Sequence, residues 1–375
     1  MSLSARPIRA RFDAAALRHN HAVARRHAGA ARLWSVVKAN AYGHGLLRVA
    51  TALREVADGF ALLELEGAIA LREAGFRQPI LLLEGFYRPA ELPLIARYQL
   101  IPALHCADQV GALVAARLPQ PLPVVLKLNT GMNRLGLDPG EFPLALERLA
   151  ASGATSEISL MTHFACADEP AGIAAQMQRL QAMTAGLRLP PRSLSLANSA
   201  ALLRYPESLQ PAEGGGENWA RPGLMLYGAS PFAPAQSAAV LDLRPVMTLE
   251  ADLVAVREIA AGEAVGYGGA FVAEHPTRIG IVACGYADGY PRHAPSGTPV
   301  AIKGRRVPLI GRVSMDKLCV DLTGCEKVGV GDTATLWGGM AGNDVPVEEV
   351  AATAGTIAYE LMCGLAARVP VLDTE

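Results

Sequence analysis

The amino-acid sequence predicts an α/β protein, with a (β/α)8 barrel of the TIM type followed by a mostly β C-terminal domain. The chain has 375 residues, more than one ordinary hydrophobic core organises, so two domains are expected. Short β-rich runs alternate with helical stretches in the first part of the chain, which indicates βα units and a parallel sheet. After Phe232 this alternation stops, and short strands separated by turns replace it.

The predicted barrel strands are short apolar runs. They are Leu33–Lys38, Gly59–Leu63, Pro79–Leu83, Gln99–Ala103, Pro123–Leu128, Ile158–His163, Ser193–Ala197 and Gly223–Tyr227. The predicted helices between and before them include Ala14–Ala28, Leu65–Ala74, Phe142–Ala151 and Ala171–Gly186. Eight such units in roughly 230 residues agree with a barrel, for which about 250 residues is typical. A doubly wound sheet is the alternative, because a count of short strands is uncertain by about one or two.

The second part of the chain is predicted to form the mostly β domain. A barrel domain is expected over residues 12–235, and residues 233–238 supply a predicted linker. The β domain then spans residues 236–375, with strands such as Arg278–Ala283 and Thr298–Ile302. The first long helix of this domain is expected over Val347–Ala367.

Composition and charge exclude several classes of protein. Apolar residues make up 51% of the chain, which is enough for large buried cores. The 34 basic and 35 acidic residues give a net charge of -1, so neither nucleic acid nor an anionic membrane is an expected partner. No apolar run approaches the roughly 18 residues of a membrane span, and the first residues lack the apolar core of a signal peptide. The six cysteines form no C-x-x-C pair, which favours reduced thiols in a cytoplasmic protein.

Polar residues collect where the predicted strands end, which is where barrels of this type place their active sites. They are Lys38 and Tyr42 after the first strand, Lys127 and Arg134 at the fifth, His163 at the sixth, Asn198 and Ser199 at the seventh, and Arg221 just before the eighth. No metal site is predicted, because His163 and Asp168 lack further ligands at suitable spacing.

The lysine at the end of the apolar run L-W-S-V-V suits an amine nucleophile. Desolvation lowers the pKa of a lysine, so the neutral amine of Lys38 can attack a carbonyl and form an imine. Tyr42, Ser199 and backbone N–H groups near Gly223 could bind the phosphate of an aldehyde cofactor. Other interpretations remain open at this point: Lys38 as a surface residue, Ser199 as the N-cap of a helix from Ala200, and Arg134 as an ion-pair partner.

The stretch V-V-K-A-N-A-Y-G-H-G closely resembles the signature around the cofactor lysine of alanine racemases, which use pyridoxal 5′-phosphate (PLP). The resemblance continues, in the family's order, through K-L-N-T-G-M-N-R-L-G, T-H-F-A-C-A-D, A-N-S-A, R-P-G-L-M-L-Y-G, V-G-Y-G, G-Y-A-D-G-Y, G-R-V-S-M-D and Y-E-L-M-C. The family's fold is a PLP-binding barrel followed by a β domain. A short N-terminal strand, here around Pro7–Phe12, is similar to one that joins this β domain, so residues 1–11 are expected to belong to that domain.

The resemblance implies a reaction with two bases. Lys38 would hold PLP covalently and then act as the base on one face of the substrate Cα. Tyr267, in V-G-Y-G, would be the acid/base on the opposite face. In this family that tyrosine comes from the partner subunit, so a homodimer with shared active sites is implied.

The resemblance also assigns roles around these two residues. Cofactor-binding residues would be Lys38, Tyr42, Arg134, His163, Asn198, Ser199, Arg221, Gly223, Leu224 and Tyr359. Arg134 and the backbone N–H of Met315 would bind the substrate carboxylate. The access corridor would be formed by Asp168, Tyr286, Arg312, Asp316 and Ile357. Lys127 matches a lysine that is carbamylated in some members.

Arg221 would face the pyridine nitrogen of PLP and keep it unprotonated, because an arginine stays protonated in proteins. That limits the cofactor as an electron sink and favours quick return of the proton over transamination. Some members have a histidine behind this arginine, where this chain has Ser195. The hydrogen bonds behind Arg221 are therefore expected to differ.

The function predicted by this resemblance is interconversion of L-alanine and D-alanine, for peptidoglycan or for alanine catabolism. One alternative is the same scaffold acting on serine or lysine, since a hydrophobic pocket discriminates by only about 1–3 kcal/mol per methylene. A related barrel decarboxylase would want an acid where this chain has Arg221. A non-catalytic PLP-binding barrel would lack the second domain with Tyr267, and a barrel enzyme unrelated to PLP is the remaining alternative.

Overall fold

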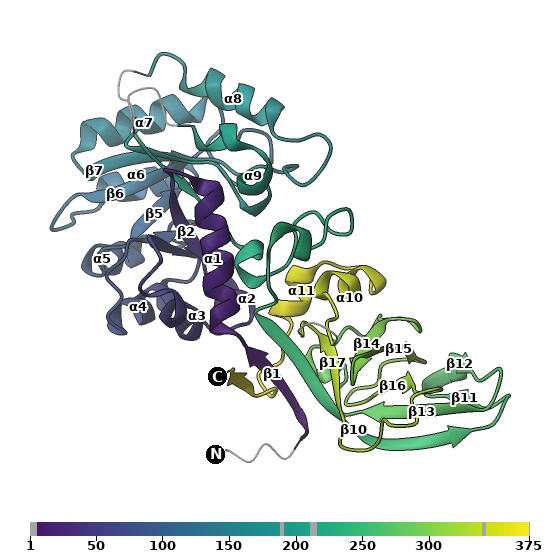
Figure 1. Cartoon of the computed structure of the whole chain (residues 1–375). Helices are drawn as coiled ribbons and strands as arrows, with labels where there is room; N and C mark the ends of the chain where they lie inside the picture. Colours follow the sequence, from purple (N-terminus) through teal and green to yellow (C-terminus); the bar gives the residue numbers. More distant parts are fainter. Residues whose placement is uncertain (1–5, 188–190, 211–215, 340–342, 375) are drawn as a thin grey trace. The chain divides into compact units, whose positions relative to one another are not determined.

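The computed structural model describes residues 6–187, 191–210, 216–339 and 343–374 (Figure 1). The chain forms two compact units. The barrel unit comprises His21–Ala41 and Gly45–Leu226. The sheet unit comprises the described parts of Met1–Asn20, Tyr42–His44 and Tyr227–Glu375. No helix among the described residues is long and apolar enough to cross a membrane.

The barrel unit contains a closed barrel of parallel strands, paired in chain order. The strands are β2 (Arg32–Val36), β3 (Gly59–Leu62), β4 (Ile80–Leu82), β5 (Ile101–Leu104), β6 (Leu122–Lys127), β7 (Thr155–Met161), β8 (Ser193–Ser195) and β9 (Glu217–Ala220). Pairing of β9 with β2 closes the barrel, so the predicted barrel is confirmed and the doubly wound alternative is wrong.

Helices follow most of these strands, as the alternating pattern predicted. The α-helices are α1 (Ala14–Ala28), α3 (Leu46–Leu53), α4 (Leu65–Glu73), α5 (Leu92–Arg97), α6 (Ala107–Ala115), α7 (Glu141–Ser152), α8 (Ala174–Thr184) and α9 (Ser199–Arg204). The short element α2 (Lys38–Tyr42) has left-handed backbone angles inside it and is not a regular helix. Short 3-10 helices are η1 (Pro89–Glu91), η2 (Pro206–Leu209) and η3 (Leu224–Tyr227). In Figure 1 the helices α3 to α8 lie around the barrel strands.

Two tryptophans cover the seam where the barrel closes. Trp34 of β2 and Trp219 of β9 are both buried, and their rings stack with centroids 4.0 Å apart. Gly59 at the start of β3 makes room for this pair, because a Cβ there would lie 2.6 Å from the Trp34 ring. A stacked aromatic pair contributes roughly 0.5–1.5 kcal/mol beyond the burial of its surface. The tryptophan pair therefore stabilises the seam in addition to the few hydrogen bonds between β2 and β9.

The eighth strand lies earlier than the sequence predicted. The predicted strand Gly223–Tyr227 is wrong: Leu224–Tyr227 forms the 3-10 helix η3, and the strand is β9, Glu217–Ala220. The run L-M-L-Y is buried all round, so its apolar pattern could not separate strand from helix. Arg221 was placed before the eighth strand; it in fact directly follows β9, at the carboxyl end of a strand.

The sheet unit is built on an antiparallel sheet around the long strand β10 (Met247–Ile259). Its other strands are β1 (Ile8–Phe12), β13 (Thr277–Val282), β14 (Pro299–Ile302), β15 (Arg305–Ile310), β16 (Leu318–Asp321), β17 (Thr333–Trp337) and β18 (Val371–Asp373), while β11 (Ala264–Val265) and β12 (Phe271–Val272) form a separate hairpin. Strand β1 pairs antiparallel with β10 and parallel with β18, so the first and last described strands lie side by side.

The helical segment near the C-terminal end of the sheet unit differs from the sequence prediction. The predicted helix Val347–Ala367 is two helices, α10 (Val347–Thr353) and α11 (Ala358–Cys363). Gly355 adopts a positive φ of 70°, which terminates α10 and reverses the chain before α11 begins. Three 3-10 turns complete this unit: η4 (Ala239–Leu241), η5 (Tyr267–Gly269) and η6 (Tyr286–Asp288).

Candidate active site

Lys38 lies in a strained turn directly after β2. Ala39, Asn40, Ala41 and Tyr42 all have φ between 52° and 55°, the left-handed region that side-chain-bearing residues avoid. Hydrogen bonds hold part of this turn: the N–H of Ala41 donates to Val37, and the Asn40 side chain accepts from the N–H of Leu46. Backbone strain of this kind concentrates at functional sites. Sequence reasoning did not predict this turn, since K-A-N-A-Y contains no glycine.

Cationic side chains act on one another at the end of the barrel unit where the strands terminate. Lys127, the last residue of β6, is buried. Burial, and then repulsion from Arg221 and Arg134, lowers the pKa of Lys127 to about 8. The carboxylate of Glu84 opposes this lowering, and the charge of Lys38 adds to it. Three other cations and one carboxylate thus act on Lys127, and this excess of positive charge favours an anionic ligand. Sequence reasoning missed Glu84, which follows β4.

Arg221 is a buried cation whose hydrogen-bond partners are all neutral. Its guanidinium donates to the carbonyl oxygens of Ser195, Thr162 and Leu196 and to the Ser195 hydroxyl, the last at 2.7 Å. Burial lowers the pKa of Arg221 to about 10, so the side chain remains charged at neutral pH. The guanidinium is therefore fixed by dipoles rather than by a counter-ion.

Ser195 provides the hydrogen bonds behind Arg221. Its hydroxyl accepts from Arg221 and donates to the carbonyl oxygen of Trp219, at 2.8 Å. Ser195 is itself buried, at the end of β8. The Ser195 hydroxyl therefore links Arg221 to the neighbouring strand β9. The sequence analysis did not assign this role to Ser195.

His163 lies beside Arg221 and is held neutral. Its Nδ1 is 3.4 Å from the guanidinium, which can only donate, so Nδ1 accepts and the ring proton is on Nε2. Burial, then repulsion from Arg221 and the other cations, keeps the pKa of His163 well below its ordinary value. A neutral imidazole is thus presented next to the buried arginine.

A hydroxyl and backbone N–H groups gather at the start of α9. Asn198 is the N-cap, and its side chain accepts from the N–H of Ala201 at 2.9 Å, so the prediction of Ser199 as N-cap is wrong. Ser199 is buried, and its hydroxyl accepts from the N–H groups of Gly223 (2.9 Å) and Met225 (3.4 Å). This set of donors has the chemistry that a phosphate requires.

Tyr42 is a buried hydroxyl in the sheet unit. Its ring stacks on Tyr227 with centroids 4.6 Å apart, and the ring of Tyr359 on α11 lies 5.7 Å away. Burial, then the neighbouring Tyr359, raises the pKa of Tyr42 well above its ordinary range. Tyr42 therefore keeps its proton and can act as a hydrogen-bond donor.

Four predicted site residues of the sheet unit have exposed side chains. Tyr267 is 71% exposed, Ile357 61%, Met315 53% and Tyr286 40%. The Tyr267 turn packs close to Arg312, because a Cβ on Gly268 would lie 3.1 Å from the guanidinium. These residues are thus presented on a surface rather than in a closed pocket of one chain.

The predicted site residues divide between the two units. The barrel unit contains the predicted site residues Lys38, Lys127, Arg134, His163, Asp168, Asn198, Ser199, Arg221, Gly223 and Leu224. The sheet unit contains the others, which are Tyr42, Tyr267, Tyr286, Arg312, Met315, Asp316, Ile357 and Tyr359. The structure joins Arg221 to His163, and Ser199 to Gly223, by hydrogen bonds. Asp168 is exposed, and its backbone carbonyl accepts from Arg204.

Comparison with known proteins finds relatives along nearly the whole chain. Residues 12–231 match the family model described as alanine racemase, N-terminal domain, and residues 246–372 match alanine racemase, C-terminal domain. The alanine racemase of Nitrosospira multiformis is 54% identical over 367 residues, covering 97% of this chain and 98% of the relative.

Solved structures agree in fold and sequence. The biosynthetic alanine racemase of Pseudomonas aeruginosa superposes with a TM-score of 0.91 at 47% identity, covering 99% of this chain and 100% of that one. The alanine racemase of Acinetobacter baumannii has a TM-score of 0.88 at 37% identity, covering 98% and 100%. The chain belongs to the alanine racemase family and is an isomerase.

Proposed function

We propose that this enzyme interconverts L-alanine and D-alanine with PLP as cofactor and two bases, Lys38 and Tyr267. The observation that carries the proposal is the group of cations, buried Arg221 among them, that acts on buried Lys127 in a member of this family. When bound, PLP supplies an electron sink that acidifies the α-proton of an attached amino acid.

The residues present fit this cofactor. Lys127 and the three cations that act on it outnumber the one carboxylate, Glu84, which favours a ligand that brings both a phosphate and, with the substrate, a carboxylate. The residues that would hold the cofactor are Lys38 by a covalent bond, Tyr42, Ser199, Tyr359 and the N–H groups of Gly223 and Leu224 at the phosphate, His163 against the ring, with Asn198 and Arg134 nearby. The donor set at Ser199 and the protonated Tyr42 support the phosphate assignment.

Arg221 would set how strongly the cofactor accepts charge. A guanidinium that donates to three carbonyl oxygens and stays charged cannot give a proton to the pyridine nitrogen. By leaving that nitrogen unprotonated, Arg221 would limit how much negative charge a bound cofactor could accept from the substrate Cα. Rapid return of the proton to Cα is then favoured over transamination.

The two bases would serve opposite faces of the substrate. Lys38 removes or returns the α-proton on one face, and Tyr267 does so on the other. The 71% exposure of Tyr267 supports a site completed by a second copy of this chain, which would cover that tyrosine. In the resulting homodimer, Met315 would offer its N–H to the substrate carboxylate, and Asp168, Tyr286, Arg312, Asp316 and Ile357 would form the access corridor.

Lys127 would carry a carbamate. With a pKa lowered to about 8, a useful fraction of its amine is neutral at physiological pH. The neutral nitrogen attacks the carbon of CO2 and releases one proton, which leaves an anion among Arg134, Arg221 and Lys38. Incubation with 13C-bicarbonate followed by NMR tests this, because a carbamate gives a carbon signal that Lys127→Ala lacks.

The reaction itself is tested with purified protein, PLP and L-alanine, by following loss of optical activity. Racemisation is expected for the wild-type protein and near loss of turnover, with cofactor retained, for Tyr267→Phe. Borohydride should fix the cofactor on Lys38. A protein that binds no PLP or leaves L-alanine unchanged would refute the proposal.

Serine and lysine are the alternative substrates, since a small pocket discriminates by only about 1–3 kcal/mol per methylene. A panel of L-amino acids decides between them. We propose a cytoplasmic role in D-alanine supply for peptidoglycan or in alanine catabolism; a deletion strain that needs D-alanine to grow would indicate the former.

The domain division is likewise a proposal, with residues 12–235 as the barrel and residues 1–11 and 236–375 as the β domain. Pairing of β1 with β10 supports the place of the N-terminal strand, although residues 1–5 lie outside the described part of the chain.

A further inference from the structure

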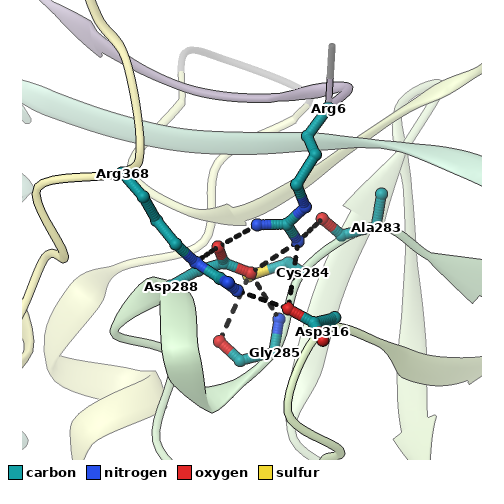
Figure 2. Close-up of polar contacts among 7 residues, drawn as sticks. All are labelled: Arg6, Ala283, Cys284, Gly285, Asp288, Asp316 and Arg368. Carbon is teal, nitrogen blue, oxygen red and sulfur yellow. Dashed lines mark hydrogen bonds and ion pairs between the residues drawn. The ribbon is translucent and has the colours of Figure 1, made fainter. Parts of the chain in front are cut away.

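A fully buried carboxylate lies in the sheet unit, in the turn η6 (Figure 2). Asp288 has a side-chain exposure of 0% and accepts from two arginines. Arg6 donates to both of its oxygens, at 2.5 and 3.0 Å, and Arg368 donates through Nε at 2.8 Å. The N–H of Gly285 donates to the same carboxylate at 3.0 Å. Asp288 is therefore saturated with donors and is a structural anion.

A second carboxylate extends this cluster toward the surface. Arg368 donates to Asp316 at 2.6 Å, and Arg6 lies 3.9 Å from the same oxygen. Figure 2 shows both guanidinium groups between the two acids. We call Arg6, Asp288, Asp316 and Arg368 the Asp288 clamp. It joins an N-terminal residue, a C-terminal residue and two internal loops.

The charges in the clamp stabilise one another. Burial by itself would raise the pKa of Asp288, but the hydrogen bonds from Arg6, Gly285 and Arg368 together lower it below its ordinary value. The hydrogen bond to Asp288 raises the pKa of Arg6, and the hydrogen bonds to Asp316 and then Asp288 raise the pKa of Arg368. Asp288, Arg6 and Arg368 are therefore each stabilised in their charged form.

The two loops that the clamp joins are packed backbone to backbone. The N–H of Tyr286 donates to Ser314, and the N–H of Ala287 donates to Met315, both at 3.0 Å. A Cβ on Gly285 would lie 2.3 Å from the Ser314 carbonyl oxygen, so only glycine allows this approach. The position of Met315 is thus tied to the turn that carries Tyr286 and Asp288.

We propose that the Asp288 clamp is a positioning device for substrate binding, with Arg368 and Asp288 as positioning residues. The inference rests on the proposed function, in which Met315 binds the substrate carboxylate and Tyr286 lines the corridor. Arg368 fixes both loops at once, because it binds a carboxylate from each. Lys38 and Arg221 belong to the barrel unit and have no part in the clamp.

The test compares Arg368→Gln with Arg306→Gln in the full-length enzyme with PLP. Arg306 is a matched control, because it pairs with Glu349 at 2.9 Å in the same unit and is similarly exposed, 47% against 40%. Arg368→Gln is expected to raise the KM for alanine about tenfold with a much smaller change in kcat, because the displaced loops would bind the substrate more weakly. Arg306→Gln should match the wild type, and Arg368→Lys should recover part of the loss.

Hydrogen–deuterium exchange provides a readout that does not depend on activity. Amides of residues 284–289 and 311–317 should exchange faster in Arg368→Gln than in Arg306→Gln. The milder Asp316→Asn, which removes only the exposed acid, should show the same effect in residues 311–317 if Arg368→Gln fails to fold. Unchanged exchange in these loops, or an unchanged KM, overturns the clamp proposal. An inactive wild type would instead contradict the proposed function, and exchange would still decide whether the clamp orders the loops.

Discussion

Arg221 and Asp288 are both buried charges, but the protein surrounds them in opposite ways. Arg221, in the barrel unit, donates to carbonyl oxygens, a hydroxyl and an imidazole nitrogen, and none of these bears a negative charge. Asp288, in the sheet unit, is bound by two guanidinium groups and a backbone N–H. Burying an ion without a counter-ion is costly, so the first arrangement needs a reason other than stability.

The difference separates a functional charge from a structural one. The pKa of Arg221 is lowered by burial, and its positive charge remains uncompensated by any of the hydrogen-bond partners described above. That charge is available to a ligand. The pKa of Asp288 is lowered because its donors more than offset burial, so its charge is already compensated. We expect replacements at Arg221 to change the chemical outcome of the reaction, and replacements at Asp288 to change stability and the order of the two loops that it joins.

Reversing the charge at position 221 is expected to have the largest effect on catalysis. Arg221→Glu places a carboxylate among carbonyl oxygens and permits a protonated pyridine nitrogen. Racemisation should fall about 100-fold, the scale for removing one preorganised electrostatic group, while pyruvate formation from alanine rises. Measuring both products of one incubation tests this. Arg221→Lys, which keeps the charge, should retain the wild-type product ratio; an unchanged ratio in Arg221→Glu would contradict the electron-sink argument.

Neutralising Asp288 is expected to cost stability. Asp288→Asn keeps the shape of the side chain but leaves Arg6 and Arg368 without their shared counter-ion. Breaking a buried pair costs about 3–5 kcal/mol, and the lower end applies because the two arginines are 33% and 40% exposed. Urea unfolding measures the loss. The exposed pair Arg306–Glu349 is the control, since Glu349→Gln should change the free energy of unfolding by about 1 kcal/mol or less. Equal losses of unfolding free energy in both variants would show that Asp288 contributes no more than a surface charge.

Removing the Ser195 hydroxyl should have a smaller effect. Ser195→Ala deletes one acceptor of Arg221 and the link to Trp219, but the backbone carbonyl of residue 195 still accepts. A hydrogen bond to a charged group is worth about 1.5–3 kcal/mol, and partial compensation by the carbonyl should reduce the loss in kcat to less than about tenfold. Steady-state kinetics tests this, with Ser193→Ala as a control on the same strand. A loss as large as that of Arg221→Glu would mean that the hydroxyl, not the carbonyls, fixes the guanidinium.

The sequence predicted local features well and long-range ones poorly. The helix Ala14–Ala28 has the predicted ends, because its apolar pattern and length are local properties. The eighth barrel strand was misplaced because E-N-W-A carries polar residues while L-M-L-Y is buried all round. The motif V-V-K-A-N-A-Y located Lys38, but not its left-handed turn, since Asn40 is the one residue of the motif that tolerates a positive φ and four consecutive residues adopt it.

The different surroundings of the two buried charges, Arg221 and Asp288, could not be predicted from the sequence either. Arg6, Asp288, Asp316 and Arg368 are separated by up to hundreds of residues, and no motif joins them. Their neighbourhood arises from strand pairing, with β1 beside β10 and β18. The acceptors of Arg221 are mostly backbone carbonyls, which any residue supplies, so their arrangement depends on where β7, β8 and β9 end.

The pH dependence of stability should show the smallest effect of Asp288. Its pKa in the folded protein is lower than the unfolded value of 3.8, so its stabilisation is fully present above that value and is lost as pH falls through the folded pKa. The gap in unfolding free energy between wild type and Asp288→Asn should therefore be constant from neutral pH down to about pH 5 and shrink only below pH 4. Urea unfolding at a series of pH values measures this gap. A gap that closes at pH 6 would mean that another group, not the carboxylate of Asp288, governs the clamp.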